Sequence, residues 1–219
     1  MRILITGGTG VLGRSFRPFA EASGHQVRAP GRAGLDLFDP VAVDAAVRGA
    51  DAVLHLATRI QSLDKMGQPE AWRENDRLRA DASAILVDAA LAGEVKTYVF
   101  PSITFVYPAG QPVSEDTPVR KDVPVIMRSV LAGERQAARF AAAGRRGVVL
   151  RLGLLDGPGT GNDHPNPGLG ATLHVEDAGR ALLAALDVPS GLYNVCRDGE
   201  RVSNRRFAEA TGWHAMRER

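Results

Sequence analysis

The sequence predicts a doubly wound α/β fold, in which helices cover both faces of a mostly parallel sheet. Short apolar runs alternate with longer amphipathic runs along all 219 residues, which is typical of repeated strand–helix–strand units. The first apolar run breaks into glycines at positions 7, 10 and 13, where a strand must turn into a helix. Hydrophobic residues make up 44% and charged residues 24% of the chain, which suits one globular domain.

Charge pattern, cysteine count and hydropathy exclude several classes of protein. Lys and Arg number 27 against 25 Asp and Glu, and the basic residues are scattered, whereas nucleic acids and anionic membranes usually bind a clustered basic face. Cys196 is the only cysteine, so an intramolecular disulfide is excluded, and the dispersed histidines predict no metal site. The sequence shows neither a charged leader nor an apolar run of membrane-spanning length, so a cytoplasmic location is expected.

The first strand covers residues 2–5 and runs into a glycine series. In dinucleotide-binding proteins the first glycine permits the sharp turn, the second lets the backbone approach a pyrophosphate, and the third lets the next helix press on the sheet. The free N–H groups of that helix then face the phosphates. A glycine-rich turn without a ligand is the alternative explanation. The residues expected to contact a dinucleotide here are Gly7, Thr9, Gly10, Val11, Leu12 and Gly13.

The second strand, over residues 26–29, ends where such folds recognise the adenosine ribose. An acidic residue there favours a free 2′-hydroxyl, whereas an arginine suits a 2′-phosphate. The chain offers Arg28 and Arg32, and no carboxylate before Asp36. This favours NADP over NAD as the cofactor. A solvated loop arginine is the alternative explanation for Arg32.

The later elements follow from apolar periodicity and from residues that begin or end helices. We expect helices over 41–48, 69–91, 128–143, 176–186 and 204–211, and strands over 51–56, 98–101, 148–152, 173–175 and 192–195. Asp39 and Pro40 predict the N-cap and first residue of the second helix. Ligands of open α/β sheets lie beyond the carboxyl ends of the strands, so Leu56, Ala57 and Thr58 should line the cofactor. We interpret His55, just before them, as a packed strand residue.

In this order the segments resemble the extended short-chain dehydrogenase/reductase family, the NAD-dependent epimerase/dehydratase group. The resemblance is carried by residues 6–13, Arg32, Asp36 and Leu37, 51–57, Asn75, 149–153, 157–159 and 174–177. It implies a Rossmann-type sheet, an NAD(P) cofactor whose adenine meets Asp36 and Leu37, and a small-molecule substrate. It also implies one domain over 1–219, with 153–175 and 189–219 forming a reduced substrate lobe. By the same analogy, a homodimer would form through the helices 69–91 and 128–143.

The sequence departs from that family at the residues that carry its chemistry. Members use a Tyr-x-x-x-Lys pair, in which the tyrosine is the acid/base and the lysine lowers its pKa. No such pair occurs in this sequence, and alignment on residues 131–134 puts Ile126 and Val130 in its place. Neither side chain can move a proton. Ser102, Thr104 and Tyr107 are then the hydroxyls expected nearest the chemistry.

Two functions therefore stay open. The favoured one is an atypical NAD(P)-dependent epimerase, dehydratase or reductase acting on a sugar-like or polyketide-like small molecule. The alternative is a non-catalytic NADP-binding sensor or partner-binding module, because loss of catalysis would remove the need for a lysine at position 130. A hydride-transfer assay separates the two.

Overall fold

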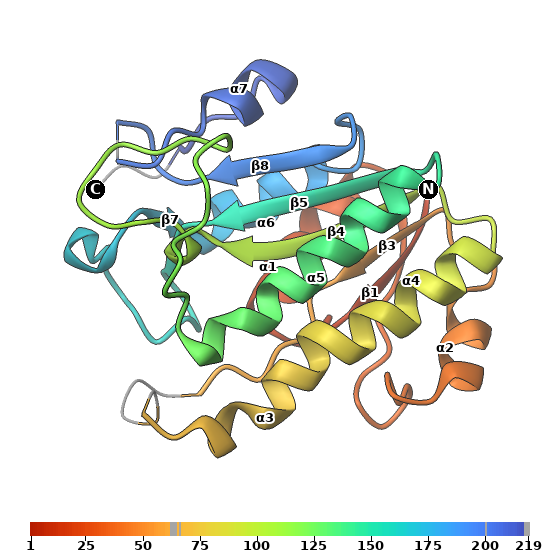
Figure 1. Cartoon of the computed structure of the whole chain (residues 1–219). Helices are drawn as coiled ribbons and strands as arrows, with labels where there is room; N and C mark the ends of the chain where they lie inside the picture. Colours follow the sequence, from red (N-terminus) through yellow and green to blue (C-terminus); the bar gives the residue numbers. More distant parts are fainter. Residues whose placement is uncertain (62–64, 66, 200, 217–219) are drawn as a thin grey trace.

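The computed structural model describes residues 1–61, 65, 67–199 and 201–216, without the side chains of residues 125, 126 and 169. The doubly wound α/β fold is confirmed, because six parallel strands form one sheet in the order β2-β1-β3-β4-β5-β8 (Figure 1). The strands are β1 (Arg2–Thr6), β2 (Gln26–Arg28), β3 (Ala52–His55), β4 (Thr97–Ile103), β5 (Arg146–Leu152) and β8 (Gly191–Val195). The chain moves from β1 outward to β2 and then back past β1 to β3, so a crevice opens where the strand order reverses.

Helices cover both faces of this sheet. Helices α1 (Val11–Ala22) and α6 (Val175–Ala184) pack together on one face (Figure 1). The other face carries α2 (Pro40–Val47), α3 (Pro69–Arg77), α4 (Ser83–Ala92) and α5 (Val125–Ala142). The expected N-cap of α2 is confirmed, since Asp39 Oδ1 accepts a hydrogen bond of 2.9 Å from the backbone N–H of Val41.

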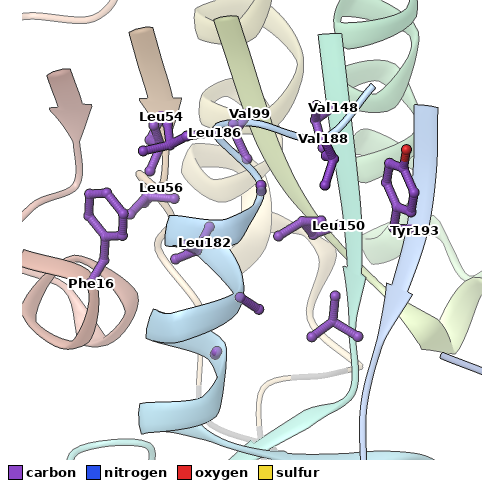
Figure 2. Packing of buried hydrophobic residues seen from close by; sticks show 14 of the residues in the cluster. Phe16, Leu54, Leu56, Val99, Val148, Leu150, Leu182, Leu186, Val188 and Tyr193 are labelled. Carbon is purple, nitrogen blue, oxygen red and sulfur yellow. The ribbon is translucent and has the colours of Figure 1, made fainter. Parts of the chain in front are cut away.

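Alternate residues of the central strands build two separate cores. Ile3 and Ile5 of β1 lie in the cluster under α1 and α6, whereas Leu4 lies in the cluster under α2, α4 and α5. This is the period of two that a strand buried on both faces requires. Figure 2 shows the first cluster, with Phe16 of α1 and Leu182 of α6 set over the strand residues.

The single helix expected over 69–91 is divided into pieces. A π-helical turn, Leu78–Ala82, separates α3 from α4. Side chains bind two carbonyls of this turn: His55 Nε2 donates to Leu78 O at 2.8 Å, and the Ser83 hydroxyl donates to Arg79 O at 2.7 Å. Local periodicity does not encode the first of these bonds, because it comes from a distant strand.

Four other features of the fold differ from expectation. Helix α5 begins at Val125, before the expected 128–143 segment, and β4 runs to Ile103, so Ser102 lies inside the strand. A second, two-stranded parallel sheet joins β6 (Leu154–Asp156) to β7 (Thr172–His174). The last helix, α7 (Arg205–Thr211), is preceded by Asn204 as N-cap.

Two segments beyond the carboxyl ends of the strands pair with each other. Val113 N donates to Arg201 O at 3.0 Å, and Ser203 N donates to Val113 O at 2.9 Å. A small apolar cluster underlies this pairing and consists of Tyr107, Val113, Ala171, Cys196 and Val202. Cys196 is thus a core residue. Among the described residues, no helix combines the length and the apolar character needed to cross a membrane.

Candidate cofactor and active site

At Gly7, Gly8 and Gly13, the loop after β1 is packed so closely that side chains do not fit. Gly7 has a φ of +75°, and a Cβ built on it would lie 2.6 Å from Ala57 Cα. A Cβ on Gly8 would lie 2.4 Å from Ala29 Cβ. A Cβ on Gly13 would lie 2.5 Å from Gly8 Cα. The loop therefore touches the ends of both β2 and β3, and only glycine allows that approach.

Helix α1 directs its amino end into the same crevice. Its N-cap is Gly10, which has no side chain with which to cap the first turn. The α-helical hydrogen bonds begin with Arg14 N to Gly10 O at 3.0 Å, so the amides of Val11, Leu12 and Gly13 lie before the first such bond. Free amides and the positive end of the helix dipole suit a pyrophosphate. The loop and the helix together fit the phosphates of a dinucleotide.

Beyond the ends of β2 and β3, two arginines pair with one carboxylate. Arg32 Nη2 lies 2.8 Å from Glu74 Oε1, and Arg59 Nε lies 3.0 Å from Glu74 Oε2. Arg28 instead donates to the carbonyls of Ala46 and Arg48. Both arginines expected at the ribose are exposed, and Arg32 is the one that pairs with a carboxylate.

The other residues expected near the adenine and along the third strand end lie as follows. Asp36 Oδ1 accepts from Phe38 N at 2.9 Å and closes its own turn, and Leu37 packs partly against the second core cluster. After β3, Leu56 is buried, Ala57 is half-buried and Thr58 is exposed. These last residues follow the strand that Gly7 contacts, so the segment lines the crevice.

His55 is a structural residue, as its place in the strand suggested. Its Nε2 donates to Leu78 O at 2.8 Å, so its Nδ1 accepts from the Thr6 hydroxyl at 2.6 Å. Complete burial lowers the pKa of His55 to about 4. The ring is neutral near neutral pH and is held by two partners.

At the carboxyl ends of β4 and β5, a buried ion pair lies where hydroxyl chemistry was expected. Arg151 donates to Glu134 through Nε at 2.9 Å and through Nη2 at 2.7 Å. The Ser102 hydroxyl donates to Glu134 Oε1 at 2.5 Å. The Arg151 guanidinium also lies over the Tyr107 ring, 4.7 Å from its centroid. Sequence reasoning missed Glu134 and Arg151 as a pair.

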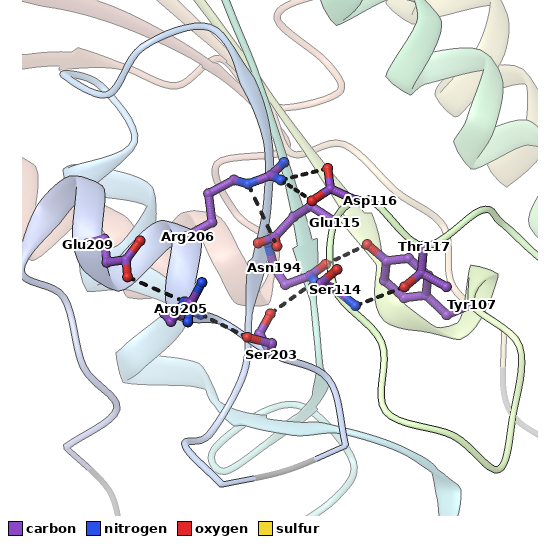
Figure 3. A network of polar contacts seen from close by, with 10 residues as sticks. All are labelled: Tyr107, Ser114, Glu115, Asp116, Thr117, Asn194, Ser203, Arg205, Arg206 and Glu209. Carbon is purple, nitrogen blue, oxygen red and sulfur yellow. Dashed lines mark hydrogen bonds and ion pairs between the residues drawn. The ribbon is translucent and has the colours of Figure 1, made fainter.

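Tyr107 belongs to a second polar network, shown in Figure 3. Its hydroxyl donates to Asn194 Oδ1 at 2.9 Å, and burial raises the pKa of this hydroxyl. Asn194 N in turn donates to Glu115 Oε1 at 2.8 Å, and Arg206 binds both carboxylate oxygens of Asp116 at 2.7 Å. The network ties the 113–117 segment to β8 and α7.

The remaining expected hydroxyl and the apolar replacements lie nearby. Thr104 is buried in the short helical turn Thr104–Val106, and its side chain hydrogen-bonds no other described residue. Val130 of α5 is fully buried in the core with Phe100 and Phe140. The side chain of Ile126 lies outside the described part of the structure.

A family model, described as the NAD dependent epimerase/dehydratase family, matches residues 3–170. The chain belongs to this family. A 3-diazoavenalumate denitrifying reductase of Streptomyces sp is 36% identical over 224 aligned positions, which cover 85% of this chain and 72% of the relative.

Solved structures share the fold of this epimerase/dehydratase family member. MoeE5 in complex with UDP-glucuronic acid and NAD has a TM-score of 0.82 at 22% identity, covering 100% of this chain and 95% of its own. A UDP-glucose 4-epimerase of Thermotoga maritima with UDP-glucose has a TM-score of 0.79 at 17% identity, covering 100% and 94%. At these identities the similarity shows the fold alone. The expected Rossmann-type architecture and the family are both confirmed.

Proposed function

We propose that this epimerase/dehydratase family member is an NADPH-dependent reductase whose hydride acceptor needs no proton from the protein. When bound, the reduced nicotinamide supplies the hydride. We assign the phosphates to residues 7–13 and the adenosine end to Arg32, Asp36, Leu37 and residues 56–58. The preference for NADP is supported by exposed Arg32 after β2 and by the lack of an earlier carboxylate there.

The observation that carries the proposal is that α5 has apolar residues at the two positions where the family has its Tyr-x-x-x-Lys pair. Reduction of a carbonyl leaves an alkoxide, which must take up a proton, and in the family the tyrosine of the Tyr-x-x-x-Lys pair supplies it. By our alignment this chain has Ile126 and Val130 at those positions, and Val130 is fully buried. An acceptor that is already cationic becomes neutral when it takes a hydride and so needs no acid.

An aryl diazonium carboxylate is the substrate class that meets this requirement. Support comes from the 36% identical relative, a denitrifying reductase of a diazo carboxylate. The terminal nitrogen accepts the hydride, and the N–N triple bond becomes a double bond. The resulting aryl diazene loses its N–H proton and its C–N bond, and dinitrogen leaves while the ring carbon takes up a proton. In sum, one diazonium and one hydride give one arene and one dinitrogen.

The hydroxyl residues then divide into two roles. Ser102 and Tyr107 act as positioning residues, since their hydroxyls donate to Glu134 and Asn194. Thr104 is the hydroxyl that we place closest to the substrate. Replacing it by valine, which keeps the shape and removes the hydroxyl, should raise KM and leave the hydride-transfer rate within about threefold.

The test is a product assay with purified protein, reduced cofactor and an aryl diazonium carboxylate. We expect one dinitrogen, measured by isotope-ratio mass spectrometry on labelled substrate, for each cofactor oxidised. UDP-glucose, UDP-glucuronic acid and a simple aryl aldehyde are the comparison substrates, and these should give no oxidation. Oxidation with a sugar nucleotide or the aldehyde, but not with the diazonium compound, would refute the proposal. Cofactor binding without any turnover would point to the sensor function.

A homodimer through α3, α4 and α5 remains part of this proposal. Val130 is enclosed within the core of its own chain, so the contact would use residues such as Leu131 and Ala138, which are half-buried and exposed. A monomeric mass by light scattering would refute the proposed homodimer.

A further inference from the structure

The two arginines on Glu74 come from opposite sides of the glycine loop. A Cβ on Gly8 would collide with Ala29 at the end of β2, and a Cβ on Gly7 would collide with Ala57 at the end of β3. Arg32 follows the first contact along the chain, and Arg59 follows the second. Contacts through the glycine loop and bonds through Glu74 therefore close a ring around the adenosine end of the crevice.

The helix that carries this carboxylate also binds the backbone of Arg59. Glu74 lies on α3, and its neighbour Asn75 is fully buried. Asn75 Oδ1 accepts the backbone N–H of Arg59 at 3.0 Å, while Glu74 holds the Arg59 side chain at 3.0 Å. Both the backbone and the guanidinium of Arg59 are thus fixed by α3. A second guanidinium, that of Arg32, reaches the same carboxylate at 2.8 Å.

We propose that Glu74 is a cofactor-specificity residue. Its carboxylate occupies the position on Arg32 and Arg59 at which a 2′-phosphate would bind. This inference rests on the proposed function. Guanidinium groups bind carboxylate and phosphate with the same planar fork of donors, so the two anions compete. A nucleotide with a 2′-phosphate must displace Glu74 or lie beside its charge. A nucleotide with a free 2′-hydroxyl neither displaces Glu74 nor brings a second negative charge beside it. Glu74 therefore reduces the difference in affinity by which NADPH is preferred over NADH.

Two nucleotide probes isolate this end of the cofactor. Adenosine 2′,5′-bisphosphate and adenosine 5′-monophosphate differ only in the 2′-phosphate, and calorimetry on the full chain gives both dissociation constants. In Glu74→Gln, we expect the bisphosphate to bind about three- to tenfold more tightly, the effect of releasing two exposed ion pairs. The monophosphate should bind as in the parent protein. Higher salt should shrink the difference, because these charges are partly exposed.

Two further variants separate the contact from a change in charge. Glu70→Gln removes a negative charge from the first turn of the same helix and should leave both dissociation constants unchanged. In Arg32→Ala combined with Glu74→Gln, the gain for the bisphosphate should be smaller than in Glu74→Gln alone, because only Arg59 remains to receive the phosphate.

The opposing results are distinct. Weaker bisphosphate binding in Glu74→Gln would mean that Glu74 positions the two arginines for the phosphate. An equal gain in bisphosphate affinity in Glu70→Gln would mean that only the net charge of the helix matters. Either would overturn the inference. Binding of both probes with no effect of Glu74→Gln would overturn the inference alone. If neither probe binds the parent protein, the proposed function fails with it.

Discussion

Arg151 and Glu134 form a two-bond ion pair, of 2.9 Å and 2.7 Å, between β5 and α5. Their side chains are only 6% and 12% exposed, so the pair lies almost wholly inside the protein. Glu134 also receives the Ser102 hydroxyl from β4. One carboxylate thus joins two neighbouring strands and the helix that covers them.

Glu134→Gln should destabilise the protein by about 3–5 kcal/mol, because it leaves the buried Arg151 charge without a counter-charge. The free energy of unfolding of each variant is measured by urea denaturation. The matched control is Asp88→Asn, which breaks the pair of Asp88 with Arg139, whose side chains are 69% and 42% exposed. That variant should cost no more than about 1 kcal/mol. Similar small losses of stability in both variants would mean that burial does not make the Arg151–Glu134 pair more costly to break.

Tyr107→Phe should act on stability rather than on the reaction. It leaves Asn194 Oδ1 without its buried donor, a loss of about 1–3 kcal/mol. Single-turnover hydride transfer should change little. The control is Tyr193→Phe, the residue before Asn194 in β8, whose hydroxyl donates to Pro189 O and not to Asn194. A fall of about a hundredfold or more in Tyr107→Phe alone, with stability intact, would instead identify an acid/base residue.

The buried ring of His55 should make the protein less stable in mild acid. Its pKa is lowered to about 4 in the folded protein and returns to about 6.5 on unfolding. As pH falls, His55 is therefore protonated first in the unfolded chain. The stability that the neutral ring contributes is present above about pH 6.5 and is lost as pH falls toward 4. Between about pH 7 and pH 5 the loss from this residue is about 2 kcal/mol.

The measurement is urea unfolding at both pH values, compared with His55→Asn. The variant should be less stable at neutral pH, because it loses contacts with Thr6 and Leu78. Its stability should also depend less on pH over this window. An equal pH dependence in parent and variant would mean that His55 is not the group responsible.

Alanine at two glycines of the cofactor loop should separate binding from folding. A Cβ at Gly10 would lie 3.1 Å from Gly7 O, a tight contact that small shifts relieve, whereas a Cβ at Gly13 would meet backbone atoms at 2.5 Å. Gly10→Ala should keep most stability and lose cofactor affinity, since its methyl group enters the phosphate path. Gly13→Ala should lose both. Calorimetry and urea unfolding distinguish them, and unchanged affinity in Gly10→Ala would place the phosphates elsewhere.

Local patterns allowed most of the fold to be predicted. Apolar runs of the strands, the Asp39 cap and the glycine spacing are all encoded within a few residues, and each is confirmed in the structure. The π-turn at Leu78 could not be predicted in this way, because it depends on a bond from His55 in a distant strand.

The candidate site was predictable only in part, for the same reason. Arg151, a charge inside an apolar strand, was a visible signal of a buried partner. Its pairing with Glu134 arises from packing between α5 and β5, so the sequence could not reveal which carboxylate it meets. The bridge from Arg32 to Glu74 likewise joins two segments whose approach is set by the sheet order.

The most direct test of hydride transfer without a protein acid is its rate in single turnovers, in water and in deuterium oxide, across about pH 6–8. An aryl diazonium carboxylate is the acceptor. We expect a flat pH profile and a solvent isotope effect of about one, because no proton moves in the step. A titrating profile with a solvent isotope effect clearly above about two would show a proton in flight and contradict the proposed function.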